Sequence, residues 1–223
     1  MNDGYAGLNI TVPHKEMALE ISSNPTERAK KIGAANTLIF KKGKIYADNT
    51  DGIGFLNNLT QLAPDWKADL GPAVVLGAGG ASRSIVYSLL NEGAPKVILT
   101  NRTYERAKKL SNIFGEKVLV INWENINKHI SGINTLVNTT TLGMVGSSNL
   151  EIDLSTLSSN TLVTDIVYNP LKTPLLEDAN RIGCKTVDGL GMLLHQAVPG
   201  FKGWFGVEPK VDSALRDRVL LEL

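Results

Sequence analysis

The sequence predicts an α/β protein in which helices cover both faces of a mostly parallel sheet. Short β-rich runs alternate with helical stretches through the middle of the chain, and a glycine-rich turn follows the first of these runs. Alternation of this kind requires crossover connections, which place neighbouring strands parallel. The predicted strands are 73–77, 96–101, 117–121, 135–140, 161–168 and 184–189, and the predicted helices between them are 81–92, 103–114, 123–131 and 173–182.

The segments on either side of this alternation are predicted to form a second, smaller α/β domain. They contain apolar patterns with strand and helix periods and a "KKGK" turn. The predicted strands are 5–12, 35–40 and 44–47, and the predicted helices are 14–23, 25–33, 52–63, 190–202 and 210–222, the last two separated by "GWFGVEP". We therefore expect a substrate domain at 1–51, a nucleotide-binding domain at 52–188, and C-terminal helices at 189–223 that return to the substrate domain.

Composition and charge exclude several classes of protein. With 23 basic and 22 acidic residues the net charge is +1, which gives no general attraction for nucleic acid or an anionic membrane. No apolar run approaches the roughly 20 residues needed to span a bilayer. The one cysteine, Cys184, cannot form an internal disulfide, and the histidines have no partner at metal-binding spacing. We expect a cytoplasmic protein without a metal.

The glycine-rich turn has the pattern of a dinucleotide-binding loop. In "VVLGAGGASRS", Gly77 permits a tight turn, Gly79 lets the backbone approach a pyrophosphate, and Ser82 replaces the usual glycine or alanine. The helix that follows offers free N–H groups to phosphates. With a strand before it and a helix after it, the loop favours a Rossmann-like domain over a purely structural turn. The predicted cofactor contacts are Gly77, Ala78, Gly79, Gly80 and Ala81.

The next predicted strand ends in "LTNRTYERA", which bears on the choice of cofactor. An NAD site usually places a carboxylate here, whereas this chain has Asn101, Arg102 and Thr103, with Arg106 one helical turn later. A guanidinium pairs well with a 2′-phosphate, so these residues predict NADP. The alternative is that the arginines are exposed and only cap a helix.

Two polar residues outside the nucleotide-binding segment form a candidate proton-transfer pair. Lys15 opens a helical stretch in "GLNITVPHKEMA", and Asp51 lies in "YADNTDGIGF". Hydride delivery to a ketone produces an alkoxide, which an ammonium can protonate while a carboxylate orients it. The alternative is that the stretch from Asp48 to Gly52 forms an Asx turn that caps the helix at 52–63.

With these residues in place, the chain resembles the shikimate/quinate dehydrogenase family. Eight motifs in the family's order cover nearly the whole chain: "GLNITVPHK", "GAANTL", "DNTDGIGF", "VLGAGGASRS", "NRTYERA", "VNTTTLGM", "DIVYNPLKTPLL" and "GLGMLLHQA". The resemblance implies reversible NADP-dependent reduction of 3-dehydroshikimate to shikimate, in aromatic amino acid biosynthesis. It implies that Lys15 transfers the proton and that Asp51 is its partner at the substrate hydroxyls.

The same resemblance implies further site residues. A substrate with several hydroxyls needs amides and hydroxyls to satisfy it when it is buried. The implied substrate contacts, besides Asp51, are Asn9, Thr11, Asn36, Tyr168 and Gln196. The implied cofactor contacts, besides the glycine loop and Asn101–Arg106, are Thr140, Ile166, Gly189, Met192 and, more weakly, Glu27.

One departure from the family pattern affects these expectations. The family normally carries a Ser-x-Ser-Pro segment that holds the substrate carboxylate, and this sequence contains no counterpart. We therefore expect an incomplete substrate domain, truncated at its N-terminus, with impaired reduction of 3-dehydroshikimate and association as a homodimer through the incomplete edge. Two alternatives stay open: a quinate/shikimate dehydrogenase paralogue, or an NADP-binding protein without catalysis.

Overall fold

The computed structural model describes residues 4–222, and the chain divides into two compact units. The first unit comprises Met1–Asn57 and Gly191–Leu223, and the second comprises Asn58–Leu190. The sequence predicts domain boundaries after residues 51 and 188, whereas the boundaries between the two units lie after residues 57 and 190.

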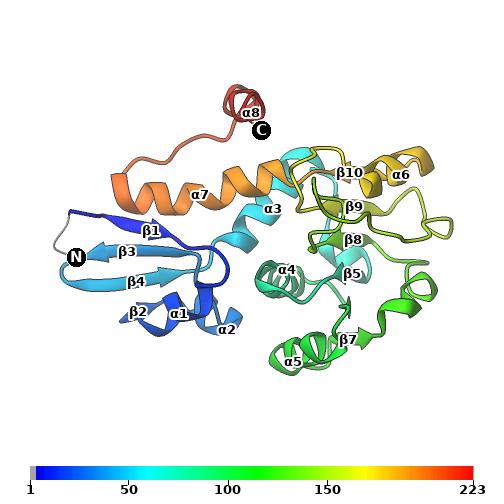
Figure 1. Cartoon of the computed structure of the whole chain (residues 1–223), viewed down its shortest axis with the longest axis horizontal. Coiled ribbons are helices and arrows are strands. Elements are labelled where there is room, and N and C mark those ends of the chain that lie inside the picture. Colours follow the sequence, from blue (N-terminus) through cyan, green and yellow to red (C-terminus); the bar gives the residue numbers. More distant parts are fainter. Residues whose placement is uncertain (1–3, 223) are drawn as a thin grey trace. The chain divides into compact units, whose positions relative to one another are not determined.

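The first unit is built on a four-stranded mixed sheet in the order β1-β3-β4-β2. In Figure 1, β1, β3 and β4 lie side by side at the blue end of the chain. The β3–β4 turn has positive φ at both Lys42 and Gly43, which is the backbone of a type I′ hairpin. The strands are β1 (Gly7–Asn9), β2 (Asn24–Pro25), β3 (Thr37–Lys41) and β4 (Lys44–Asp48), of which only β2 pairs in parallel.

Helices of the first unit pack on this sheet and on one another. Gly54 lies in α3 (Asp51–Leu62), and a Cβ on it would lie 2.6 Å from the carbonyl oxygen of Met192 in α7 (Leu190–Phe205). A Cβ on Gly203 of α7 would lie 2.3 Å from the Ile39 side chain of β3. Glycine therefore permits both close approaches of α7. The helices that lie wholly or partly in this unit are α1 (Lys15–Glu20), α2 (Glu27–Ile32), α3 (Asp51–Leu62), α7 (Leu190–Phe205) and α8 (Ser213–Leu220).

The second unit is a doubly wound parallel sheet of six strands in the order β10-β9-β8-β5-β6-β7. This order reverses direction between β5 and β8, and nucleotides bind outside the carboxyl ends of strands at such a reversal. Helices α4 and α5 pack against β5, β6 and β7, and α6 packs against β9 and β10. The strands are β5 (Ala73–Leu76), β6 (Val97–Thr100), β7 (Val118–Ile121), β8 (Thr135–Asn138), β9 (Leu162–Asp165) and β10 (Lys185–Val187), and the helices are α4 (Gly80–Asn91), α5 (Tyr104–Phe114) and α6 (Pro174–Ile182).

Two expectations about helices are wrong in detail. The segment predicted as a helix over 123–131 is a 3₁₀-helix, η2 (Trp123–Lys128). The spacing of three between its apolar residues Trp123 and Ile126 is compatible with either kind of helix. The helix predicted over 190–202 extends as α7 to Phe205, and both the predicted and the observed helix include Pro199. Gly203, just beyond the predicted end, lies close to the Ile39 side chain of β3, a contact that one sequence does not reveal.

Two short elements have no counterpart among the predicted ones. They are β2 and the 3₁₀-helix η1 (Ala68–Leu70). Among the described residues, no helix has both the length and the apolar character needed to cross a membrane.

Candidate functional site

Lys15 and Asp51 form a nearly buried ion pair in the first unit. Lys15 is the first residue of α1 and Asp51 the first of α3, and Nζ lies 2.5 Å from Oδ2. The two side chains are only 13% and 8% exposed. A pair removed from water in this way holds its geometry and interacts more strongly than a pair at the surface. The structure thus brings together the two residues that the sequence proposes for proton transfer.

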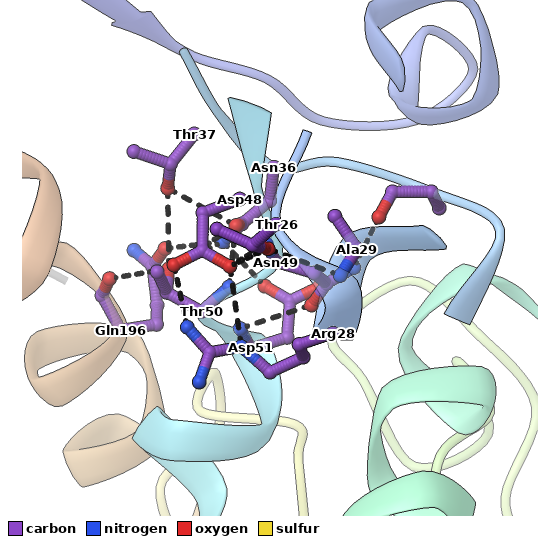
Figure 2. Close-up of polar contacts among 11 residues, drawn as sticks. Thr26, Arg28, Ala29, Asn36, Thr37, Asp48, Asn49, Thr50, Asp51 and Gln196 are labelled. Carbon is purple, nitrogen blue, oxygen red and sulfur yellow. Dashed lines mark hydrogen bonds and ion pairs between the residues drawn. The ribbon is translucent and has the colours of Figure 1, made fainter. Parts of the chain in front are cut away.

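A polar cluster surrounds the carboxylate of this pair, and Figure 2 shows its members. The Asn36 side-chain amide donates to the other Asp51 oxygen, Oδ1, at 2.9 Å, and lies 3.0 Å from Gln196 Oε1. The Thr50 hydroxyl donates to the main-chain oxygen of Gln196 at 2.8 Å, and the Thr50 N–H donates to Asn36 Oδ1 at 2.7 Å. Three predicted substrate residues, Asn36, Asp51 and Gln196, therefore share one hydrogen-bonded network.

The turn that carries Asp51 is fixed by a second set of contacts, which the sequence does not predict. Arg28 binds Asp48 with two bonds, Nη2 to Oδ2 at 2.5 Å and Nε to Oδ1 at 3.2 Å (Figure 2). Asn49, which is fully buried, donates to the Ala34 carbonyl at 3.0 Å and accepts from the Asp51 N–H at 3.3 Å. The Asx turn considered as an alternative to a catalytic role is therefore present together with the Lys15–Asp51 pair.

The other predicted substrate residues do not belong to this network. Asn9 ends β1, opposite Thr37 of β3, and both Asn9 and Thr11 are exposed. Tyr168 lies in the second unit after β9 and is 37% exposed.

The glycine loop of the second unit connects β5 to α4 as expected. Gly77 has a φ of +105°, and a Cβ there would lie 2.7 Å from the Thr139 hydroxyl oxygen, so only glycine fits this turn. A Cβ on Gly79 would meet nothing within 4 Å, which leaves open space beside the loop. The Gly80 and Ala81 N–H groups lie in the first turn of α4, where helix geometry provides no carbonyl partner. Open space and unpaired donors at a helix N-terminus fit a pyrophosphate.

Side chains hold this loop in place. The Gly79 N–H donates to Ser82 Oγ at 3.1 Å, and Ser82 Oγ lies 2.6 Å from the Thr139 hydroxyl. Because the Thr139 hydroxyl donates to the Leu76 carbonyl at 2.6 Å, Ser82 is the donor to Thr139. Ser82 thus has a structural reason to replace the usual glycine or alanine. The loop is also tied to the end of β6, since the Ala78 N–H donates to Asn101 Oδ1 at 3.1 Å.

A cavity of about 320 Å³ lies beyond the ends of β6, β7 and β8. It contains the predicted residues Asn101, Arg102, Thr103, Arg106 and Thr140, and three residues that the sequence interpretation missed, namely Trp123, Thr141 and Leu142. No carboxylate is among these lining residues, so a phosphate would meet two guanidinium groups without a repelling charge. The cavity therefore fits the phosphorylated end of NADP.

The remaining predicted cofactor residues are divided between the two units. Ile166 and Gly189 are in the second unit, where a Cβ on Gly189 would lie 2.3 Å from the Ile166 carbonyl oxygen. Met192 and Glu27 are in the first unit. Met192 is buried in α7, and Glu27 has a side chain that is 79% exposed and paired with Lys30.

A buried carboxylate lies behind the cavity, at the end of β9. Asp165 accepts bonds from Asn138 Nδ2 (3.0 Å), the Val167 N–H (3.0 Å) and Thr173 Oγ1 (2.8 Å). Burial raises the pKa of Asp165 above its usual value, and these three uncharged donors offset only part of that effect. Asn138 in turn accepts from Thr140 at 2.7 Å, so Asp165 is connected to a residue that lines the cavity.

Thr50, Ser82, Asn138 and Asp165 have no site role in the sequence interpretation. Each is a small polar residue whose burial is the only sign of its importance, and burial is not visible in one sequence. Within residues 4–222, no three His, Cys, Asp or Glu side chains are grouped so that they could hold a metal ion.

Comparison with known proteins gives matches across both units. Residues 63–190 match the family model for shikimate/quinate 5-dehydrogenase, and residues 1–38 match the shikimate dehydrogenase substrate-binding domain. The chain is 55% identical over 218 residues to the shikimate dehydrogenase (NADP(+)) of Ruegeria sp. strain TM1040, and 56% identical to that of Roseobacter denitrificans. Each match covers 97% of this chain and 79% of the relative.

Solved structures agree with these matches. The quinate dehydrogenase of Corynebacterium glutamicum in complex with NAD has a TM-score of 0.90 and 33% identity, covering 99% of this chain and 79% of that one. The shikimate 5-dehydrogenase of Thermus thermophilus in complex with NADP(H) and shikimate has a TM-score of 0.81 and 34% identity, covering 93% and 76%. The resemblance inferred from eight motifs is confirmed, and this chain belongs to the shikimate dehydrogenase family.

Proposed function

We propose that the protein catalyses the reversible, NADP-dependent reduction of 3-dehydroshikimate to shikimate, a step of aromatic amino acid biosynthesis. The observation that carries the proposal is the Lys15–Asp51 pair, at 2.5 Å and almost withdrawn from solvent. A lysine and a carboxylate held in this way serve a reaction that moves one proton to or from an oxygen. The NADP-dependent shikimate dehydrogenases that are about 55% identical to this chain support the same reaction.

The chemistry assigns one task to each member of the pair. The cofactor, when bound, supplies a hydride to the carbonyl carbon of the substrate. The Lys15 ammonium then donates a proton to the carbonyl oxygen, so that a hydroxyl forms and Lys15 becomes neutral. Asp51 accepts a hydrogen bond from the ammonium and orients it. In the reverse direction, neutral Lys15 accepts the hydroxyl proton.

The substrate hydroxyls and ring are assigned to polar residues of the first unit. Asn36 and Gln196 present amide groups beside Asp51, and a polyol requires such groups when it leaves water. We also assign Asn9, Thr11 and, from the second unit, Tyr168 to substrate binding, on the strength of the family motifs in which they occur.

The cofactor is assigned to the glycine loop and to the cavity beyond β6–β8. The N–H groups of Gly80 and Ala81 would bind the pyrophosphate, and the guanidinium groups of Arg102 and Arg106 would bind the 2′-phosphate. Ala78 and Gly79 already donate within the protein, so these two residues would shape the loop. Asn101 and Thr103 belong to the same strand end, with Thr140 across the cavity. We assign Ile166, Gly189, Met192 and Glu27 to the cofactor from the family motifs alone.

A spectrophotometric assay tests the function. NADPH oxidation is followed with 3-dehydroshikimate as the substrate, and NADP reduction is followed with shikimate. We expect turnover in both directions, with NADPH used in preference to NADH. An absence of turnover at saturating concentrations of both reactants, from protein that binds NADPH, would identify a non-catalytic NADP-binding protein.

A second candidate function is the dehydrogenation of quinate. It is favoured by the likeness to the Corynebacterium glutamicum quinate dehydrogenase, with its TM-score of 0.90. That enzyme is described in complex with NAD, whereas this chain has Arg102 and Arg106 and no carboxylate among the cavity residues. Parallel measurement of kcat/KM for shikimate and quinate, each with NADP and NAD, distinguishes the two functions.

We further propose that the protein is a cytoplasmic homodimer. Its one cysteine is a buried free thiol, which is typical of a reducing compartment. In the first unit, β1 is an edge strand, and Tyr5, Leu8 and Val12 in or beside it are 65%, 42% and 67% exposed. Such an edge favours association with a second copy. Light scattering of the purified protein should give twice the 24.1 kDa chain mass, and a monomer at all concentrations would contradict the dimer.

A further inference from the structure

The cavity beyond β6–β8 has two unlike walls. Arg102 and Arg106 form a basic wall that suits a phosphate. Trp123 and Leu142 form an apolar wall, which a phosphate alone does not need. A ligand that uses the whole cavity therefore combines an anionic group with a flat apolar one.

Trp123 is well placed to serve such a ligand. It follows β7 directly, at the first turn of η2, and it is half-buried. Trp123 and Leu142 both pack against the buried hydrophobic cluster of the second unit, which includes Ile126 and Ile121. The indole is thus supported by the core while part of it lines the cavity, so its orientation does not depend on the ligand.

We propose that Trp123 is the residue that binds the adenine base, with the ring stacked on the indole and Leu142 beside it. This inference rests on the proposed NADP-binding function and adds a residue that no motif in the sequence indicates. An adenosine 2′-phosphate carries a planar base and a phosphate on one ribose, which matches the apolar and basic walls of one cavity. Stacking requires only a π-face and gives no preference for the 2′-phosphate.

The proposal separates the role of Trp123 from that of the arginines. Loss of the indole weakens every ligand that contains adenosine, with or without the 2′-phosphate. Loss of Arg102 weakens only the ligands that carry this phosphate. Substitutions of Trp123 and of Arg102 should therefore change the binding affinities of two small ligands, one with and one without the 2′-phosphate, in different ways.

Binding of adenosine 2′,5′-bisphosphate and of AMP, measured by calorimetry, tests the inference. Neither ligand contains a nicotinamide, so the measurement does not depend on turnover. Trp123→Leu keeps an apolar side chain against the core and should weaken both ligands by a similar factor, about 5- to 100-fold, the range of one base–aromatic contact. Trp123→Phe keeps an aromatic face and should restore most of the affinity.

Tryptophan fluorescence provides a second readout that does not depend on the stability of the leucine variant. The chain has tryptophans only at positions 66, 123 and 204. Adenosine 2′,5′-bisphosphate should quench part of the emission of the parent and of Trp204→Phe, a control in the first unit, but not that of Trp123→Phe.

Equal affinities of the parent and Trp123→Leu, or quenching that persists in Trp123→Phe, would overturn the inference and leave the proposed function intact. If the parent binds neither ligand, the inference and the NADP site both fail. If the ligands bind as predicted to the parent and the Trp123 variants but the protein shows no turnover, only the proposed reaction is overturned.

Discussion

The Thr50 hydroxyl donates a hydrogen bond of 2.8 Å to the main-chain oxygen of Gln196, a residue 146 positions later in the chain. Thr50 is fully buried and precedes Asp51, while Gln196 lies in α7. One hydroxyl thus joins the start of α3 to the helix that carries a proposed substrate contact. Asn36 contacts both residues, so the three form a closed cluster around the Asp51 carboxylate.

We predict that Thr50→Val destabilises the protein by about 1–3 kcal/mol, because it leaves buried polar partners without a hydrogen bond. Valine has nearly the same shape, so the loss reports the hydroxyl and not a cavity. Thr50→Ser keeps the hydroxyl and should cost less. Urea unfolding of the parent and both variants gives the comparison. A stability of the valine variant equal to or above that of the serine variant would contradict a stabilising role of the Thr50 hydroxyl and its hydrogen bonds.

Replacement of Lys15 by alanine should reduce turnover by roughly 10²–10⁴-fold, the usual scale for a general acid–base group. The affinity for NADPH should change little, because the glycine loop and the arginine cavity lie in the other unit. Lys44→Ala, which removes an exposed lysine of the β3–β4 hairpin, is the matched control. Turnover of Lys15→Ala within a few-fold of the control would remove Lys15 from the mechanism.

Arg102→Ala should narrow the preference for NADPH over NADH. The lost guanidinium contact with the 2′-phosphate should cost about 1–3 kcal/mol for NADPH and little for NADH, as is typical of bonds to charged groups. Lys108→Ala removes one positive charge from α5, the helix that follows Arg102, at a position outside the cavity, and thereby controls for a general loss of positive charge. Equal losses for both cofactors, measured by fluorescence titration, would mean that Arg102 does not contact the 2′-phosphate.

The sequence predicted the residues whose chemistry depends on a local pattern. Gly77 and Gly79 were recognisable because a strand, a turn and a helix must follow one another around a phosphate loop. Lys15 and Asp51, which are 36 positions apart, were paired only through the family resemblance and the needs of a proton transfer.

Residues that depend on packing were not predicted. Trp123 is predicted to follow the strand at 117–121, but no motif indicates that it lines the same cavity as Arg102. The extension of α7 from residue 202 to Phe205 coincides with close contacts of Gly203 and Gly200 with side chains of β3 and of α7 itself. Such contacts join distant parts of the chain, and no local pattern encodes them.

The pH dependence of stability should reveal the buried carboxylate of Asp165. Its pKa in the folded protein is raised above its usual value of 3.8, chiefly by burial, so folding favours the protonated form. The contribution of this group is therefore most favourable at low pH and is lost as the pH rises from about 4 through the folded pKa. Asp165→Asn removes this dependence, and its amide can still accept from Asn138 and Val167 and donate to the Thr173 oxygen.

The measured quantity is the difference in unfolding free energy between Asp165→Asn and the parent, followed from pH 4 to pH 7. Contributions of all other groups cancel in this difference. It should rise with pH, because Asp165 of the parent then carries a buried charge. Asp153→Asn provides a control that should give a nearly flat difference over this range. Asp153 is exposed and its pKa is lowered by the Ser155 N–H at 2.9 Å, so its contribution is fully present above about pH 4 and is lost only as the pH falls further. A flat or falling difference for Asp165→Asn would show that the three donors fully compensate burial, and that the carboxylate is ionised at no cost to the fold.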